Sequence, residues 1–592
     1  MTTISSLIIG FSAGATKRER YNPPPCRYSN ARALLSLGAT LLVGLVSPVN
    51  LLAQHSEAVG GSVRSEVFVG SAAENYLRYL QTIGLVPLYP WSSRSFSPRE
   101  LDRLIPRDSA HPWAARFRRG PRVGPVEYDF IRPTSTLRFN SAFPYGTNDG
   151  PVWAGKGLTS SAQAGVAVRW KMFSLTIAPM AFRSENSSFD MLPTLNTGPL
   201  AFADPIYGGV DRPQRFGATA YSQVDPGQST LRIDLPIISA GVSTANMGWG
   251  PGTEYPLILG NNAAGFPHVF VGSSEPLNVL IGKLHGKIMW GELFQSKFSP
   301  VQGSSHYISR LESGTTRFAT GIVLTFLPRG VTGLEIGGSR FFHSIWPVSG
   351  IPRSYLTKVF QGVLKKDLPF DFPMDPRFPA GSEVQGTSDN QLISAFMRWA
   401  LPHSGFELSG EYGREDHAYD FRDLIQEPDH SRFYALGARK VLSHSPVSLT
   451  AARAEIINFQ LPQLSRYRGE GEIYFHGLIR QGHTNRGQLL GADVGVGAAA
   501  GSTLAVDHYS STGSWTASWV RDLNRENGDY LVLGVRRPRS MDVTHALGFQ
   551  ITRFLDAFEI TGGLTFARDF NRNFTADVNN LNATFSVSYK LR

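Results

Sequence analysis

The chain has 592 residues, of which 18% are charged and 11% aromatic, with 60 glycines and a formal net charge of +10 at pH 7. Soluble proteins usually carry about 25% charged residues, so this composition indicates a chain that meets two different solvents. The Lys and Arg residues are scattered rather than gathered in blocks, and we therefore expect no nucleic-acid partner.

The first 53 residues have the pattern of a secretory signal peptide. Basic residues precede an apolar run over residues 33–46, Pro48 breaks that run, and Ala53 offers a small residue at the cleavage site. A transmembrane anchor would need about 20 apolar residues, which is longer than this run. Cleavage would also remove Cys26, the only cysteine in the sequence, so the mature chain is expected to contain no disulfide and no thiolate metal site.

Residues 54–120 are predicted to form a small helical segment, which the family resemblance described below places in the periplasm. Two helices are expected within residues 71–105, because helix start and stop signals flank short amphipathic stretches there. An extended, proline-rich connector separates them. We expect this segment to pack against the rest of the chain rather than to form a catalytic or partner-binding unit. The signals are Ser71 with Glu74, Gly84, and Ser97 with Pro98 and Glu100.

Residues 121–592 are predicted to form a large antiparallel outer-membrane β-barrel. Residues 581–591 alternate strictly, so that every second side chain is apolar or aromatic and those between are polar. This length matches the roughly 9–11 residues that a tilted strand needs to cross a bilayer. The apolar side chains of this strand are Leu581, Ala583, Phe585, Val587, Tyr589 and Leu591.

The same alternation recurs upstream, and the apolar faces carry no charge. A Lys or Arg on a lipid-facing position costs about 2–4 kcal/mol near the middle of a bilayer, so uncharged faces fit a lipid environment. A soluble β-sandwich usually closes within about 100–250 residues, whereas a closed barrel takes up a longer series of strands without leaving edges. The upstream strands run through residues 166–170, 173–177, 231–237, 318–326, 393–401, 406–412, 547–551 and 558–566.

Residues 248–252 (GWGPG) form a rigid glycine-rich motif with an aromatic residue at its centre. The face of Trp249 is suited to stacking on a sugar ring, and Asn261 and Asn262 carry amides that hydrogen-bond hydroxyl groups. A barrel-closing turn or an inward plug is the alternative, because glycine permits close approach of the backbone. These three residues are candidate ligand-binding residues.

Three carboxylates, Glu411, Glu415 and Asp416, lie near the end of a predicted strand. Paired carboxylates hydrolyse glycosides, but Glu411 and Glu415 stand about 13 Å apart in an extended strand, which exceeds the separations that glycosidases use. We therefore expect these carboxylates to be solvated loop or lumen charges that bind sugar hydroxyls or a cation rather than to catalyse a reaction. Arg486 is expected to form hydrogen bonds in the lumen, and all four residues are candidate ligand-binding residues. The histidines lack a ligand set with metal-binding spacing, so no metal site and no cofactor are expected.

Four segments carry a family resemblance: LVPLYPWSSRSFSPRELDRL (residues 85–104), GWGPGTEYPLILGNNAAGFPHVFV (248–271), ELSGEYGREDH (407–417) and YFHGLIRQGHTNRGQLLGADVGVGAAAGS (474–502). In this order they resemble the Wzi-type capsule assembly family of outer-membrane proteins. The resemblance implies a barrel of about 18 strands with periplasmic helices and lectin-like binding of capsular polysaccharide.

We therefore expect a non-enzymatic protein of the outer-membrane lipid bilayer, a monomer, that binds and anchors capsular polysaccharide or exopolysaccharide at the cell surface. A porin-like or glycan-transport channel is the alternative, because an open and a plugged lumen use similar residues. A secreted glycan-active enzyme with a β-rich fold is a third hypothesis, and such an enzyme would be soluble without detergent.

Overall fold

The computed structural model describes residues 63–105, 110–117, 121–206, 210–301, 316–346, 350–364, 389–460, 473–476, 479–526, 531–532, 535–536 and 541–590. The predicted signal peptide over residues 1–53, and Cys26 within it, lie outside these ranges. The described residues belong to one compact unit, Val59–Arg592.

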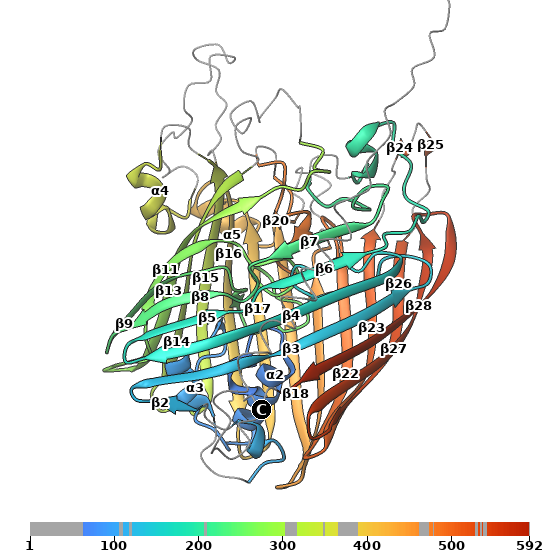
Figure 1. Cartoon of the computed structure of the whole chain (residues 1–592). Helices are drawn as coiled ribbons and strands as arrows, with labels where there is room; N and C mark the ends of the chain where they lie inside the picture. The colour runs from blue at the N-terminus through green and yellow to red at the C-terminus, as the bar shows by residue number, and fades with distance from the viewer. Residues whose placement is uncertain are drawn as a thin grey trace, which may run out of the picture. The chain divides into compact units, whose positions relative to one another are not determined.

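Within the described residues, 18 antiparallel strands close on themselves to form a barrel, as predicted (Figure 1). The wall strands are β3 (Val126–Asn140), β4 (Gly157–Trp170), β5 (Phe173–Ile177), β6 (Met180–Ser184), β7 (Tyr221–Asp225), β8 (Thr230–Asp234), β9 (Ile238–Ser243), β11 (His268–Ser273), β12 (Leu277–Val279), β13 (Gly282–Phe294), β14 (Thr316–Pro328), β15 (Leu334–Ile345), β16 (Asp389–Leu401), β17 (Phe406–Glu415), β18 (Arg432–His444), β19 (Ser448–Asn458), β22 (Ala500–Ser510), β23 (Gly513–Glu526), β26 (Met541–Phe554), β27 (Phe558–Arg572) and β28 (Ala576–Tyr589). Three of the barrel strands are interrupted, since β5 continues into β6, β7 into β8 and β11 into β12.

The C-terminal strand β28 closes the barrel by pairing with β3, from Asn582 opposite Asn140 to Ser588 opposite Thr134. The apolar side chains of residues 581–589 point outward, with Leu581, Phe585 and Tyr589 exposed, while the polar side chains between them face the lumen. The strict alternation of the sequence therefore predicted both the strand and its orientation. The hairpin predicted upstream of it is also confirmed, because β26 pairs with β27 through a tight turn.

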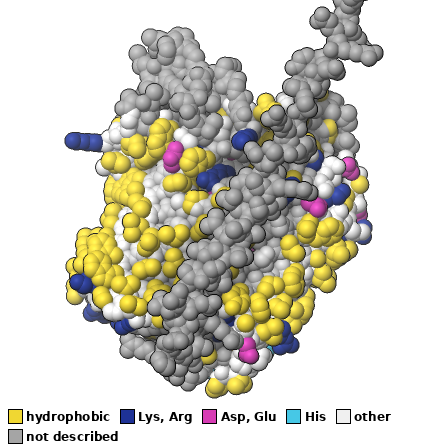
Figure 2. Space-filling model, in the orientation of Figure 1, with side chains coloured by type: hydrophobic (Ala, Val, Ile, Leu, Met, Phe, Trp, Pro, Cys, Tyr) yellow, Lys and Arg dark blue, Asp and Glu magenta, His cyan; other side chains and the backbone are white. Residues whose placement is uncertain are grey.

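The outer face of the wall is apolar on many strands. Figure 2 shows hydrophobic side chains over much of the visible wall, with charged side chains mainly towards its two ends. This is the surface that a barrel presents to lipid. No helix in the described part of the chain is long and apolar enough to cross a membrane. Exposed apolar side chains on the wall include Leu137, Leu231, Val242, Val269, Leu324, Leu408, Leu436, Leu504, Leu547, Leu564 and Phe585.

The two ends of the barrel differ in the length of their connections. At one end the connections have two to five residues, as at 171–172, 329–333, 402–405 and 511–512. The other end carries the long connections 244–267, 346–388 and 459–499. Outer-membrane barrels have short periplasmic turns and longer extracellular loops, so the short-turn end is the periplasmic one.

The helices of the predicted N-terminal segment lie at the periplasmic end (Figure 1). Ser71 caps the first helix by accepting from the N–H of Glu74, and Gly84 follows its end with a φ of +76°. The Glu74 carboxylate accepts from the N–H of Gly70 instead of Ser71, so the start signal at Ser71 and Glu74 forms one half of a capping box, in which each of the two side chains would bond the backbone of the other. The box at Ser97 is complete. The helices are η2 (Val63–Glu66), α2 (Ala72–Thr82), α3 (Pro98–Leu104) and η3 (Ala114–Arg116).

The remaining elements lie outside the wall ladder. Three two-stranded sheets of two-residue strands form in irregular segments of the described chain. β2 (Arg122–Val123) pairs with the start of β3. These pairs are β1 (Ser93–Arg94) with β10 (Gly248–Trp249), β20 (Thr484–Asn485) with β21 (Gln488–Leu489), and β24 (Leu531–Val532) with β25 (Val535–Arg536). The helices of the extracellular connections are η4 (Gly198–Phe202), α4 (Arg353–Thr357), η5 (Lys358–Phe360) and α5 (Phe421–Gln426).

Candidate functional site

Two long extracellular connections fold back into the barrel. They comprise residues 244–267, between β9 and β11, and the described parts of 459–499, between β19 and β22. We call these two connections the plug. Their apolar side chains form one buried cluster with inward-facing residues of the wall, so the plug fills part of the lumen. Members of the cluster are Trp249, Leu257, Ile258, Tyr474, Leu489 and Val496 from the plug, and Phe270, Phe341, Leu392 and Phe433 from the wall.

Carboxylates of the wall hold the irregular backbone of the plug. Buried N–H groups need partners, and the short β-pairs of the plug supply few of them. Glu455 on β19 accepts hydrogen bonds from the N–H groups of Thr253 (3.0 Å) and Glu254 (2.8 Å). Glu415 on β17 accepts one from the N–H of Tyr474. Glutamate side chains of the wall thus fix both connections of the plug inside the lumen.

The connector between α2 and α3 is docked in the same way. The N–H groups of Trp91 and Ser92 donate to Glu335 on β15 at 2.9 and 2.8 Å. The next two residues form β1, which pairs with β10 in the plug. The sequence predicted an extended connector, and the structure adds that it runs through the lumen as a third part of the packed interior.

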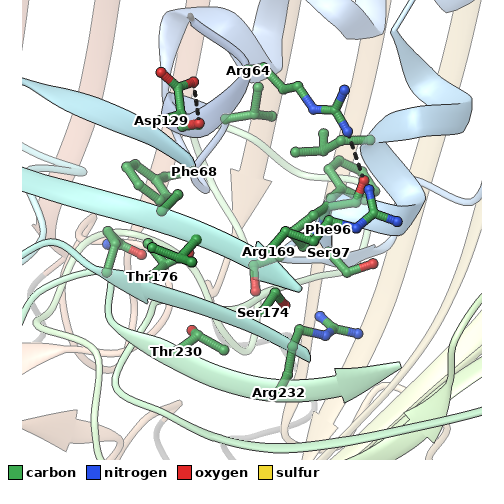
Figure 3. A pocket seen from close by; sticks show the side chains of 18 of the residues that line it. Arg64, Phe68, Phe96, Ser97, Asp129, Arg169, Ser174, Thr176, Thr230 and Arg232 are labelled. Atoms are coloured by element: carbon green, nitrogen blue, oxygen red, sulfur yellow. Dashed lines mark hydrogen bonds between the residues drawn. The ribbon is translucent and has the colours of Figure 1, made fainter. Parts of the chain in front are cut away.

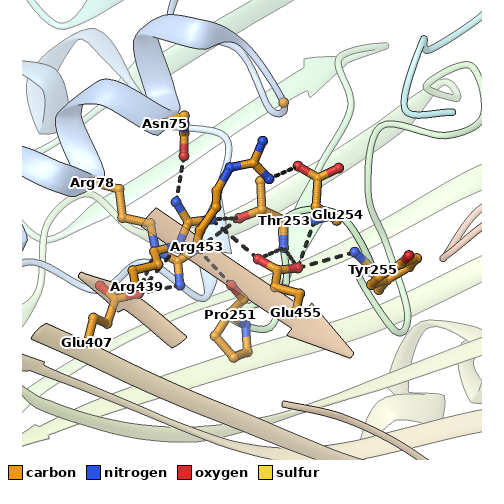
Figure 4. Close-up of polar contacts among 12 residues, drawn as sticks. Asn75, Arg78, Pro251, Thr253, Glu254, Tyr255, Glu407, Arg439, Arg453 and Glu455 are labelled. Carbon is orange, nitrogen blue, oxygen red and sulfur yellow. Dashed lines mark hydrogen bonds and ion pairs between the residues drawn. The ribbon is translucent and has the colours of Figure 1, made fainter. Parts of the chain in front are cut away.

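A buried ion network joins α2 to the wall (Figure 4). Glu407 on β17 accepts from Arg78 Nε at 2.9 Å and from Arg398 Nη2 at 2.6 Å, and Arg439 lies 3.9 Å away. Arg78 also donates to the carbonyl of Pro251 in the plug at 2.7 Å. Burial lowers the pKa of Arg78 to about 10, which leaves its guanidinium charged at neutral pH.

The predicted carboxylates Glu411 and Glu415 are buried on the same lumen-facing side of β17 as Glu407. Glu411 accepts from Ser394 at 2.6 Å and packs against Gly250, where an added Cβ would lie 2.0 Å from the carboxylate. Each of the three glutamates contacts a different segment, namely α2 or one of the two plug connections. The three glutamates, spaced along one face of the strand, therefore hold α2 and the two plug connections against the wall.

Trp249 has no exposed surface. Its ring lies against Gly321 on β14 and edge-on to Phe341, with the ring centroids 6.0 Å apart. This is the position of an inward plug, which the sequence offered as the alternative to sugar stacking. A sugar ring has no access to the face of Trp249 in this conformation.

The two predicted asparagines donate to backbone carbonyl groups of other connections. Asn261 donates to the carbonyl of Asn148 at 2.7 Å. Asn262 donates to the carbonyl of Leu489 at 2.9 Å, and it also lines an extracellular pocket described below. Among the described residues that line this pocket, Asn262 is the one that also belongs to the seven predicted site residues.

The remaining two candidates occupy separate places. Arg486 donates to Asp225 at 2.5 Å and lies over the ring of Phe294. Asp416 lies 3.3 Å from the Nε2 atom of His476. The structure therefore does not bring the seven candidates together into one site.

His483 in the plug is buried and neutral at physiological pH. Its Nε2 atom lies 2.6 Å from the carbonyl oxygen of Ile258, and its Nδ1 atom lies 3.2 Å from Nε2 of His343. Burial, with the nearby charge of Arg317, lowers the pKa of His483 from 6.5 to about 3. The folded state therefore favours the neutral ring, and its contribution to stability is present above pH 6.5 and is lost as the pH falls towards 3.

We expect acid to loosen the plug through this histidine. The temperature at which the folded gel band is lost should fall between pH 7.5 and pH 4.5, and His483→Gln should weaken that fall. His403, at a short periplasmic turn, provides the matched control, His403→Gln. An unchanged pH dependence in His483→Gln would contradict this assignment.

A pocket lies at the extracellular end, between the plug and the wall strands β23, β26 and β27. Its volume is ≈ 210 Å³. Half-buried aromatic side chains stand next to acids, amides and guanidinium groups, which is the mixture of apolar surface and convergent polar groups that ligand sites use. The lining includes Tyr145, Trp153, Phe189, Asp204, Arg212, Gln214, Asn262, Gln488, Asp493, Asp522, Asn524, Arg525, Asp542 and Asn573.

The charged groups of this extracellular pocket are held in place by one another. Arg525 binds both oxygens of Asp204, at 3.2 and 2.6 Å, and Arg212 donates to Asp493 at 2.9 Å. Burial alone would raise the pKa of Asp204, but the ion pair with Arg525 lowers it below its ordinary value. The carboxylate is therefore charged and rigidly placed at neutral pH.

Trp153 gives the extracellular pocket its largest aromatic surface. Its ring packs at 5.0 Å from Phe216, which fixes its orientation. Sequence reasoning missed this pocket because its residues come from five separate connections and strand ends. A usable signal was that Tyr145, Trp153 and Phe189 all lie outside the predicted strands, where aromatic residues are not needed for a lipid-facing surface.

A second pocket, of ≈ 100 Å³, lies at the periplasmic end between α3 and the inner side of the wall (Figure 3). The charged side chains of its lining already have partners. Arg169 donates to Asp102 at 2.6 Å, Arg64 pairs with the same carboxylate, and Ser65 donates to Asp129 at 2.6 Å. These contacts dock the helical segment on the barrel, so we assign them a structural role.

The described residues contain no group of three or more His, Cys, Asp or Glu side chains arranged to hold a metal ion. Glu411 and Glu415, the pair examined for glycoside hydrolysis, are enclosed by the plug and the wall. The extracellular pocket is thus the place where the chemistry of the described side chains suits a ligand best.

These features define the class: an outer-membrane β-barrel with a plugged lumen and a polar extracellular pocket. Among solved structures, the chain has the fold of Wzi from Escherichia coli, an outer-membrane protein involved in group 1 capsule assembly and described as a carbohydrate-binding β-barrel. The TM-score is 0.56 at 13% sequence identity, over 88% of this chain and 99% of Wzi.

Two further solved barrels match with lower TM-scores. OccAB3 of Acinetobacter baumannii matches with a TM-score of 0.38 and 9% identity over 79% of this chain and 100% of its own. OpdQ of Pseudomonas aeruginosa matches with a TM-score of 0.37 and 8% identity over 79% of this chain and 98% of its own. No protein-family model and no curated protein sequence matches the chain.

Proposed function

We propose that this protein binds capsular polysaccharide or exopolysaccharide without enzymatic turnover and anchors it at the cell surface. The observation that carries the proposal is the extracellular pocket, which combines the half-buried ring of Trp153 with fixed carboxylate, amide and guanidinium groups. A sugar presents C–H groups on its faces and hydroxyl groups around its rim, and this pocket offers a partner for each. The Wzi fold supports the same function.

Binding is favoured over transport because the lumen is packed. Plug side chains and the connector at Trp91 fill the interior with buried apolar groups, and wall glutamates hold their backbone. A porin needs an aqueous path through the lumen. We propose a monomer that contacts the polysaccharide from the extracellular side.

Deletion of the gene tests the proposal. Polysaccharide is expected to move from the cell-bound fraction to the medium, while the total amount made stays constant, because attachment is lost and synthesis is not. Re-expression of the wild-type chain should restore retention. Unchanged retention in the deletion strain would overturn the proposal, and large stable single-channel currents of the purified protein in planar bilayers would favour a channel.

A further inference from the structure

A segment of the extracellular connection between β15 and β16 lies on the outer face of the wall. This segment, residues 350–364, contains α4 and η5, and we call it the flap. Gly321 on β14 faces the plug, so Phe318 on the same strand faces outward. Phe318 is nevertheless only 2% exposed, because Tyr355 of the flap covers it with the ring centroids 5.4 Å apart.

An outward-facing arginine fastens the flap to the wall. Arg340 on β15 donates to the flap carbonyls of Gln361 at 2.6 Å and Gly362 at 2.9 Å. An arginine that faced lipid with no partner would be costly, so these carbonyls stabilise it and the flap together. Lys358 of the flap forms a buried ion pair with Asp389. The flap is therefore a fixed part of the outer surface.

Beside the flap, the outer wall is hollowed by an apolar groove of ≈ 730 Å³. Its floor consists of outward-facing side chains of β8, β9 and β11, namely Leu231, Val242 and Val269, each about half exposed. Leu356 of α4 forms its roof, held by a hydrogen bond of 2.9 Å from Trp290 Nε1 to the Leu356 carbonyl. The groove is continuous with the lipid-facing surface.

The position of the groove along the wall shows which leaflet of the membrane it faces. Val242 and Val269 lie next to the ends of β9 and β11 that lead into the long extracellular connection 244–267. This end of the wall lies in the outer leaflet. A protein gains little hydrophobic energy from apolar contacts inside a bilayer, so a bound lipid is held there by close packing on several sides. A floor, a roof and a flanking indole provide that packing.

We propose that the groove between the flap and strands β8, β9 and β11 binds one acyl chain of an outer-leaflet lipid. The site is separate from the extracellular pocket and does not depend on polysaccharide binding. Its volume falls within the range of about 300–1,000 Å³ that ligand pockets occupy. Filling the groove with a larger apolar side chain should expel the acyl chain without placing a polar group in lipid.

The test compares Val242→Trp, which fills the groove, with Leu436→Trp on the outer face of β18, away from the groove and similarly exposed. Each protein is reconstituted in nanodiscs of palmitoyl phosphatidylethanolamine and phosphatidylglycerol and then transferred to detergent. Native mass spectrometry then measures how many phospholipid molecules stay bound. The wild type and Leu436→Trp are expected to retain one phospholipid, and Val242→Trp is expected to lose it. Heat-modifiable gel mobility checks that all three proteins fold.

A phosphatidylglycerol with a diazirine in its acyl chain locates the bound lipid. Crosslinks are expected to concentrate on the groove around Leu356 and Val269, and to become sparse there in Val242→Trp. Equal lipid retention by Val242→Trp and the wild type would overturn the proposal. So would crosslinks spread evenly around the barrel, or crosslinks between the groove and another part of this chain, which would make the chain itself the occupant.

Discussion

Replacement of Glu407 by Gln is expected to lower the free energy of unfolding by about 3–5 kcal/mol, the usual cost of removing one partner from a buried ion pair. Glu407 is 1% exposed and accepts from Arg78 and Arg398, with Arg439 nearby. Its loss leaves three guanidinium groups together without their shared carboxylate. The temperature at which the folded gel band disappears measures the effect.

Glu275→Gln is the matched control. Glu275 pairs with Arg99 and Arg103 at the periplasmic rim, where the partners are partly exposed to solvent. Such pairs contribute up to about 1 kcal/mol, so this variant should unfold close to the wild type. Equal effects of the two substitutions would show that the network around Glu407 does not hold α2 in the barrel.

Replacement of Trp153 by Ala is expected to weaken polysaccharide binding at least tenfold, which corresponds to about 1.4 kcal/mol. Large aromatic side chains in partly enclosed positions supply a major share of contact area in binding sites. Isothermal titration of the purified barrel with polysaccharide fragments from the same cells measures the affinity. Asp493→Asn should also weaken binding, because it removes the partner that orients Arg212.

Trp519→Ala controls for the loss of a tryptophan. Trp519 lies on β23 opposite the outward-facing Leu547, so it faces lipid rather than the pocket. It should leave the affinity unchanged. If Trp153→Ala folds and binds as tightly as the wild type, the extracellular pocket is not the polysaccharide site, even where deletion of the gene releases polysaccharide.

The wall of the barrel follows closely from the sequence. Successive side chains of a strand face lipid and lumen in turn. The alternation of apolar and polar residues over 581–591 and 558–566 therefore predicts which side chains face lipid. The confirmed hairpin β16–β17 follows from the same pattern and from its turn at residues 402–405. The number of strands did not follow from the pattern, since short strands such as β7 and β9 give weak signals.

The lumen was harder to predict. Glu411 and Glu415 were recognised as a group on one face of a strand, but their partners, Gly250 and Tyr474, are separated from them by 59 residues or more. Trp249 carries the same aromatic surface whether it stacks on a sugar or packs on a wall. Its burial depends on Gly321, in a strand that the local sequence does not connect with it.

The sequence by itself determined the membrane-facing strands and the helix caps, because both depend on neighbours two to four residues away. Only the tertiary structure decided which carboxylates dock the plug, where the pocket lies and how the flap meets the outer wall. Those features join residues such as Arg78 and Glu407, which are 329 positions apart. Such contacts arise only when the strands close into a barrel, because closure brings distant segments into one enclosed volume.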